Sequence, residues 1–201
     1  MDINSPIRIG VLVSGGGTNL QALIDSQREK ILSTGEVSLV LSSSRNAYAL
    51  IRAQEAGVPS LVAEGSSRED IILQAVREHN IKLLVLAGYI KILSEDFLEQ
   101  VGIPVINIHP SLLPKYGGKG YYGLRVHEAV LANQESYSGA TVHYVDATPD
   151  GGEIIAQEQV EVYPDDTPES LQKRIMENVE WILLPQVIEE LAKKIRDEES
   201  L

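Results

Sequence analysis

Short apolar runs alternate with helix-length amphipathic stretches along the first half of the chain, and this alternation constrains the possible folds most strongly. The apolar runs are Ile7 to Val13, Val37 to Leu41, Leu83 to Ala87 and Val105 to Ile108. The stretches between them, which we predict to be helical, are Asn19 to Arg28, Ala47 to Ala56, Arg68 to His79 and Ser94 to Gln100. Continuous apolar strands joined by helices are typical of a parallel sheet with helices on both faces. The sequence therefore predicts an α/β fold with a mostly parallel central sheet.

The second half of the chain has a different pattern. Thr141 to Val145 and Glu153 to Val162 alternate more between apolar and polar residues, which predicts antiparallel strands at one edge of the sheet. Thr167 followed by a proline predicts the start of a long helix, running to about Arg196 with a kink near Pro185. Because the chain has no repeat, linker or low-complexity tract, we predict a single domain over residues 1–201.

Composition excludes several classes of protein. The 201 residues are 43% hydrophobic, enough for one sizeable core, and the absence of cysteine excludes disulfides, a thiolate zinc site and a catalytic thiol. The formal net charge of -12 argues against a nucleic-acid partner. No stretch reaches the roughly 18 apolar residues of a membrane span. We therefore expect a cytoplasmic protein with small-molecule substrates, in an oligomeric state that the sequence does not indicate.

A glycine-rich segment, Ser14 to Asn19, joins the first predicted strand to the first predicted helix. Glycines let a ligand approach the backbone, and the N–H groups at a helix N-terminus favour an anion, so the segment predicts a phosphate site. A simple tight turn with Thr18 or Asn19 as the helix cap is the alternative. A dinucleotide site is less favoured, because Leu20 occupies the third glycine position and Ser42 to Arg45 lack the expected acid.

Two polar residues, Asn107 and His109, end the fourth apolar run. Residues two apart on a strand point to the same face, and ligands bind at the carboxyl ends of strands in such sheets. We expect Asn107 to donate to a developing oxyanion, and Asp150 to fold back and keep His109 protonated. A satisfied core pair, and a plain Asp-Gly-Gly turn, are the alternatives. Neither Ser111 nor the four histidines form a hydrolase or metal motif, so no metal is predicted.

The chain resembles the glycinamide ribonucleotide formyltransferase family in five motifs, which are, in order, SGGGTNLQ, LVLAGYIKIL, NIHPSLLPKY, SGATVHYVD and PDGG. The resemblance extends from about Ile7 to about Pro185. It implies a Rossmann-like formyltransferase fold, with a phosphate-binding N-terminal half and a folate-binding and catalytic C-terminal half. It also implies an enzyme of de novo purine biosynthesis. Such an enzyme transfers the formyl group of 10-formyltetrahydrofolate, its co-substrate, to the amine of glycinamide ribonucleotide.

The resemblance also implies roles for individual residues. The catalytic residues would be Asn107, His109 and Asp150. The nucleotide-binding residues would be Gly17, Thr18 and Asn19 at the phosphate, and Glu180 at the glycinamide end. The folate-binding residues would be Arg68, Ile90, Lys91, Ile92, Leu93 and Asn107. Two departures from the family are Lys91, where arginine is common, and the loop from Gly117 to Gly123, which is either a lid or a surface turn.

Three other functions remain open. A formyltetrahydrofolate deformylase would use water as the formyl acceptor. A methionyl-tRNA formyltransferase, which shares the HPSLLP motif, would use charged tRNA, against which the acidic composition argues. A sugar-phosphate sensor would use the glycine-rich loop but would leave Asn107, His109 and Asp150 without a role.

Overall fold

The computed structural model describes residues 5–200, which form a mixed sheet with helices around it. Within this range the strands are β1 (Ile7–Val13), β2 (Gly35–Ser42), β3 (Ser60–Val62), β4 (Leu83–Leu86), β5 (Val105–His109), β6 (Tyr137–Tyr144) and β7 (Ile154–Glu161). The helices are α1 (Thr18–Arg28), α2 (Tyr48–Glu55), α3 (Arg68–Glu78), α4 (Glu95–Val101), α5 (Leu124–Ala132), α6 (Pro168–Ile175), the π-helix η1 (Met176–Glu180) and α7 (Trp181–Glu199). The strand order is β3-β2-β1-β4-β5-β6-β7, which confirms the predicted fold class.

The chain divides into two compact units. Unit 1 contains the described residues up to Ile106 and those from Pro185 onward, and unit 2 contains Asn107 to Leu184. Unit 1 is thus built from two separate stretches of chain, with all of unit 2 between them.

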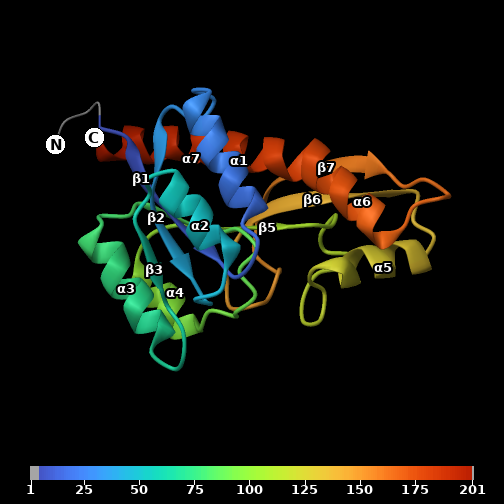
Figure 1. Cartoon of the computed structure of the whole chain (residues 1–201), viewed down its shortest axis with the longest axis horizontal. Helices are drawn as coiled ribbons and strands as arrows, with labels where there is room; N and C mark the ends of the chain where they lie inside the picture. Colours follow the sequence, from blue (N-terminus) through green and yellow to red (C-terminus); the bar gives the residue numbers. More distant parts are fainter. Residues whose placement is uncertain (1–4, 201) are drawn as a thin grey trace. The chain divides into compact units, whose positions relative to one another are not determined.

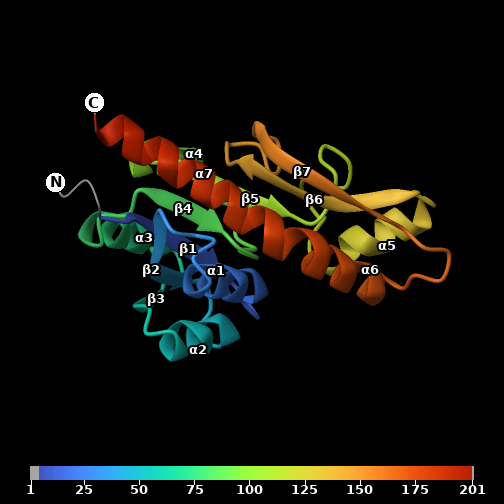
Figure 2. The same cartoon turned by 90° about the horizontal axis from the view of Figure 1, so that it is seen from above.

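The parallel strands of unit 1 account for its core. β1 pairs in parallel with β2 and β4, and β2 pairs with β3. Figure 2 shows helices on both sides of these strands, with α2 on one side and α4 on the other. β1 and β4 are therefore buried on both faces, which explains their continuous apolar sequences.

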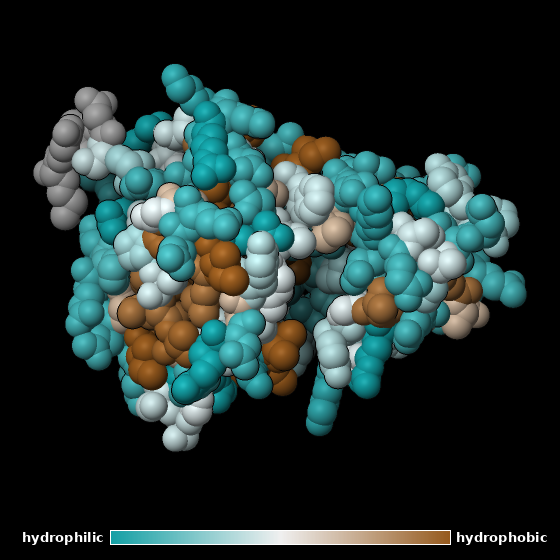
Figure 3. All heavy atoms as spheres, in the orientation of Figure 1, coloured by the Kyte–Doolittle hydropathy of each residue, from teal (hydrophilic) through white to brown (hydrophobic). Residues whose placement is uncertain are grey.

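The sequence analysis did not predict β3, the edge strand of unit 1. It has only three residues, two of them exposed, and its Leu61 is 41% exposed. Figure 3 shows a hydrophobic area in the region of α2 and β3. Ile51 of α2 and Leu61 of β3 are both exposed. A strand this short offers few free backbone groups for pairing with another chain.

A buried carboxylate fixes the C-terminal part of α7 within unit 1. Glu189 accepts hydrogen bonds from the backbone N–H groups of Ser33 and Thr34 at 2.9 and 2.8 Å. It also accepts from the hydroxyls of the same two residues, at 3.0 and 2.8 Å. Burial raises the pKa of Glu189, but the four hydrogen bonds lower it by more than burial raises it. The net pKa is about 2. The charged carboxylate therefore anchors the helix to the turn that precedes β2.

In unit 2, β6 and β7 form the predicted antiparallel pair. Gly139 lies opposite Gln159, and a Cβ on Gly139 would lie 1.9 Å from the Glu158 carbonyl oxygen, so only glycine fits there. α5, which the sequence analysis did not predict, contacts α6, and α6 also contacts both strands (Figure 1). These contacts bury the apolar face of α6.

The long C-terminal helical run begins as predicted but contains an unexpected π-helix. Thr167 and Ser170 form a reciprocal capping box, with proline at the first helical position. The π-helical turn η1 then separates α6 from α7, and Pro185 lies inside α7. No helix in residues 5–200 is long and apolar enough to cross a membrane.

Candidate active site

The loops after β1 and β4 meet at a topological switch point of the sheet. β2 lies on one side of β1 and β4 on the other, which is where open α/β sheets bind ligands beyond the strand ends. The Ser14 hydroxyl, directly after β1, accepts a hydrogen bond from the Ile90 N–H at 3.0 Å. It also shares one with the Ser43 hydroxyl, at 2.7 Å. The predicted phosphate loop and the predicted folate segment therefore begin side by side in unit 1.

The glycine-rich loop packs against α2. Gly17 has a φ of 70°, and a Cβ there would lie 2.6 Å from the Cβ of Ala49. The Ala49 N–H donates to the Gly15 carbonyl at 3.1 Å, and Arg52 Nε donates to the Gly16 carbonyl at 2.8 Å. A Cβ on Gly15 or Gly16 would instead meet no atom within 4 Å. Packing against α2 thus explains why a glycine is needed at position 17, but not at positions 15 and 16. Gly15 and Gly16 leave their backbone accessible to a ligand.

The N-terminus of α1 is suited to an anion. Gly17 is the N-cap and supplies no side-chain capping hydrogen bond, and the first turn contains no acidic residue. The N-cap position is thus occupied by Gly17, and not by Thr18 or Asn19 as in the alternative. The dipole of α1 and the nearby Arg52 guanidinium both favour negative charge at this loop.

The predicted folate segment is held by the start of α3. Arg68 Nη2 donates to the Ile92 carbonyl at 3.2 Å, and Glu69 accepts from the Ser94 N–H and hydroxyl at 3.2 and 2.5 Å. Ile90 and Ile92 are 64% and 61% exposed. Lys91 is exposed and Leu93 is buried. The segment thus exposes two isoleucines on a backbone that α3 restrains.

Asn107, His109 and Asp150 come together in unit 2, as predicted. Asn107 Nδ2 lies 3.4 Å from Asp150 Oδ1, and His109 Nδ1 lies 3.4 Å from Asp150 Oδ2. His109 Nε2 is 2.7 Å from the Tyr116 carbonyl oxygen. Because a carbonyl only accepts, Nε2 carries a proton, and Nδ1 is the nitrogen that gains or loses one.

The loop that carries Asp150 depends on its two glycines. A Cβ on Gly152 would lie 1.9 Å from the Tyr144 carbonyl oxygen, and one on Gly151 would lie 2.7 Å from Thr148 Cγ2. The Gly118 N–H donates to Asp150 Oδ2 at 2.8 Å. The Asp-Gly-Gly sequence therefore makes a turn and also directs its carboxylate to the histidine. Through Gly118, the start of the loop from Gly117 to Gly123 therefore contacts the carboxylate of Asp150.

The loop after His109 is held by β6 and β7. Thr141 Oγ1 donates to the Ser111 carbonyl at 2.7 Å and accepts from the Leu113 N–H at 3.1 Å. Gln157 Nε2 donates to the Leu113 carbonyl at 3.1 Å. The Ser111 hydroxyl donates to the Lys115 carbonyl at 2.7 Å, a structural bond that agrees with setting Ser111 aside as a nucleophile.

Burial and the neighbouring carboxylate act on His109 in opposite directions. Burial lowers the pKa of His109, the Asp150 carboxylate and the Tyr116 carbonyl raise it, and the net shift is downward. Burial raises the pKa of Asp150, but the neighbouring imidazoles and the Gly118 N–H lower it more, and the net shift is downward. Asp150 thus favours the charged ring, as expected, while desolvation opposes it.

A second histidine, His143 at the end of β6, lies beside these three residues and was not predicted as a site residue. It is 2% exposed, and its Nε2 lies 3.1 Å from Asn107 Nδ2 and 3.7 Å from Asp150 Oδ1. The sequence contained one sign that His143 belongs to a site, namely a polar histidine among the apolar residues of a buried strand. That pattern does not reveal which face of β6 the histidine occupies.

Glu180 is the last residue of the π-helix η1. It is 8% exposed and follows Val179, which is also buried. The wider π turn places two consecutive residues on the buried side, and single π turns in longer helices are frequent at functional sites. Glu180 stays a predicted ligand of the nucleotide.

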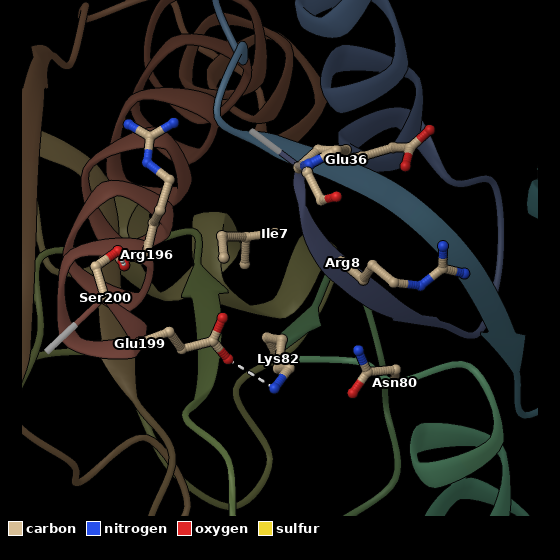
Figure 4. Close-up of a pocket in the computed structure, with 10 residues that line it drawn as sticks. Ile7, Arg8, Glu36, Asn80, Lys82, Arg196, Glu199 and Ser200 are labelled. Atoms are coloured by element: carbon tan, nitrogen blue, oxygen red, sulfur yellow. Dashed lines mark hydrogen bonds and ion pairs between the residues drawn. The ribbon is translucent and has the colours of Figure 1, made fainter. Parts of the chain in front are cut away.

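A cavity of about 460 Å³ in unit 1 lies at the amino ends of β1 and β4, opposite the carboxyl ends that bind ligands in such sheets (Figure 4). Its Lys82 is paired with Glu199 at 2.6 Å, and Arg8 Nε donates to the His79 carbonyl at 2.6 Å. Among the described residues no group of three histidines or acids is arranged to hold a metal ion.

The fold and these residues correspond to one known family. Residues 7–188 match a family model described as formyl transferase. Because this match includes both units, the chain belongs to the formyl transferase family.

Its relatives carry a more specific name. The phosphoribosylglycinamide formyltransferase of Haemophilus influenzae is 35% identical over 187 residues, which cover 90% of this chain and 85% of that protein. The chloroplastic enzyme of that name from Arabidopsis thaliana is 35% identical over 84% of this chain. The chain spans only 60% of the length of this plant relative. The crystal structure of phosphoribosylglycinamide formyltransferase from Anaplasma phagocytophilum matches with a TM-score of 0.86 and 36% identity, over 94% of this chain and 89% of that one.

Proposed function

We propose that this protein transfers the formyl group of 10-formyltetrahydrofolate to the amine of glycinamide ribonucleotide, as a single formyltransferase domain in the cytoplasm. The observation that carries the proposal is the group formed by Asn107, His109 and Asp150, in which the carboxylate lies 3.4 Å from both the amide nitrogen and the imidazole Nδ1. The names of the relatives support the same reaction. The family match across residues 7–188 supports the single domain.

The reaction begins when the amine of the nucleotide attacks the formyl carbon. A C–N bond forms, the formyl oxygen becomes negative, and the attacking nitrogen becomes an ammonium. Asn107 donates a hydrogen bond to this oxyanion, for which one donor typically contributes about 2.7–4 kcal/mol.

Proton transfer then involves the histidine and the aspartate. The ammonium loses its proton to the His109–Asp150 pair, directly or through a water molecule. The resulting imidazolium stabilises the oxyanion, and the lowered pKa of His109 leaves its ring free to accept this proton at neutral pH. The proton next moves to the folate nitrogen as its bond to the formyl carbon breaks. Formylglycinamide ribonucleotide and tetrahydrofolate are the products.

The remaining predicted residues bind the two substrates. Gly17, Thr18 and Asn19 bind the phosphate of the nucleotide, supported by the uncapped, acid-free start of α1. Glu180 contacts its glycinamide end. Arg68 and the segment from Ile90 to Leu93 bind the folate, supported by the exposed isoleucines and the hydrogen bond from Arg68 to Ile92. The proposed partners are these small molecules alone, without nucleic acid or membrane.

One assay separates this function from its alternatives. The protein is incubated with 10-formyltetrahydrofolate, and tetrahydrofolate release is measured with and without glycinamide ribonucleotide. Release that requires the nucleotide supports the proposal. Equal release without it indicates a deformylase, and no release in either case indicates a sensor.

The phosphate loop gives a prediction that separates packing from binding. Gly16→Ala should leave stability unchanged and raise KM for the nucleotide at least about tenfold, because its Cβ is free of protein contacts but obstructs a phosphate. Gly17→Ala should destabilise the protein by roughly 1–3 kcal/mol, because it combines a strained φ with a clash against Ala49. Thermal unfolding and steady-state kinetics measure both. A normal KM for a folded Gly16→Ala protein would mean that the loop is only a turn.

A further inference from the structure

The buried ring of His143 contacts the side chain of Asn107. The ring is 2% exposed, so water does not compete for its nitrogens. Nδ1 lies 2.8 Å from the Tyr144 carbonyl oxygen, and Nε2 lies 3.1 Å from Asn107 Nδ2. Both ring nitrogens therefore have a protein partner.

The backbone carbonyl determines the tautomer of this ring. A carbonyl oxygen has lone pairs and no proton, so Nδ1 must be the nitrogen that carries hydrogen. In the neutral ring Nε2 then holds a lone pair and can only accept. A protonated ring would instead direct an N–H from Nε2 towards Asp150 Oδ1, but that distance is 3.7 Å, longer than the 3.1 Å to Asn107. Nε2 thus lies closer to Asn107 than to Asp150, and we take Asn107 as the donor to it.

An accepting Nε2 determines which way the Asn107 amide faces. If the amide were turned by 180°, its oxygen would face the Nε2 lone pair and the two would repel. With the NH₂ group facing His143, one N–H bonds to the ring. The second N–H donates to Asp150 Oδ1 over the longer distance of 3.4 Å. A ligand oxygen would have to replace this longer contact, while the bond to His143 remains.

We propose that His143 is a positioning residue that keeps Asn107 oriented as a hydrogen-bond donor to the formyl oxygen. This inference rests on the proposed function. A turned amide would present its own oxygen to the developing oxyanion, which would replace a stabilising contact with a repulsive one. His143 thus acts on the rate through Asn107, without touching the reacting atoms.

The test compares three replacements of His143 in the full-length protein. His143→Gln places an amide oxygen near the position of Nε2 and keeps the acceptor, whereas His143→Asn is too short to do so and His143→Phe removes it. We expect Phe and Asn to lower kcat about 100-fold, in line with the loss of one oxyanion donor, and Gln to restore it to within about tenfold of wild type. KM for both substrates should change less than about threefold, since only the transition state is affected. His79→Phe, in unit 1, is the control and should behave as wild type.

A double-mutant cycle with Asn107→Ala tests whether the effect passes through Asn107. If it does, His143→Phe should cause no further loss of kcat in the Asn107→Ala background. Equal losses in both backgrounds, a fully active Phe variant, or Gln and Asn variants of equal activity would each overturn the proposal.

A measurement on the wild-type protein does not depend on activity or on the folding of any variant. Long-range ¹⁵N–¹H correlation spectra should find the His143 ring proton on Nδ1, and none on Nε2. A proton on Nε2 would overturn the inference even in an active enzyme. If the wild type shows no formyl transfer but has the expected tautomer, the proposed function fails while the assigned contact between His143 and Asn107 stands.

Discussion

Asp150→Asn should lower kcat by about 100- to 1000-fold, within the range of general acid–base catalysis, while substrate binding changes little. The amide keeps the size of the carboxylate and can still accept from the Gly118 N–H. It cannot take part in moving the proton of the attacking amine, and it no longer stabilises the imidazolium of His109. The loss should therefore appear in kcat and be measurable by steady-state formyl transfer.

The same substitution should change the pH dependence in a defined direction. The Asp150 charge raises the pKa of His109 against the larger effect of burial, so its removal lowers that pKa further. Since the proposed reaction needs a neutral His109 at the start, the acid limb of kcat/KM should move to lower pH. Asp146→Asn is a matched control, because Asp146 is exposed in the same loop and its carboxylate accepts from the Thr148 N–H within that loop. An unchanged kcat and pH profile in Asp150→Asn would assign this aspartate to the turn alone.

Glu189→Gln should destabilise the protein by about 2–3 kcal/mol, the range for a hydrogen-bonded charged group in the interior. The carboxylate accepts from four donors of Ser33 and Thr34, and an amide presents its own N–H group to some of them. Urea unfolding measures the change. Glu190→Gln, at the neighbouring exposed position of α7, should change stability by less than about 0.5 kcal/mol.

The contribution of Glu189 should also depend on pH. Its pKa is about 2 in the folded protein, against an ordinary value of 4.5. A lowered pKa gives stability that is complete above pH 4.5 and is lost as the pH falls towards 2. The difference between wild type and Glu189→Gln should therefore be constant near neutral pH and shrink below about pH 4.5. A difference that stays constant down to pH 2 would contradict the role of the charge.

Much of the fold could be predicted from local patterns. The four apolar runs are strands because they are covered on both faces, and Thr167 with its following proline starts a helix through a capping box. β3 was missed because its three residues are too few for a periodic signal. The π turn was missed because the sequence from Met176 to Glu180 has no feature that distinguishes a π-helix from an α-helix.

In the candidate site, too, local sequence patterns predicted some residues, whereas features that depend on the tertiary structure were missed. Asn107 and His109 were predicted from their shared face at a strand end, Asp150 from its place in a loop that can fold back, and the resemblance to a family supported all three. The opposing effect of burial on the pKa of His109 was not predicted, because the sequence does not report how completely the ring is desolvated. His143 was missed because the pairing of β6 in the folded sheet brings it to Asn107, from 36 residues away.

The division of unit 1 into two stretches has a consequence for how the chain reaches its native state during synthesis. The ribosome delivers all four strands of unit 1 from β1 to β4 early, but the carboxylate that satisfies the Ser33–Thr34 turn comes after the whole of unit 2. Until Glu189 emerges, two backbone N–H groups and two hydroxyls before β2 lack their partner. We therefore expect nascent chains that end before Pro185 to be cleaved by protease near this turn, and full-length chains to resist.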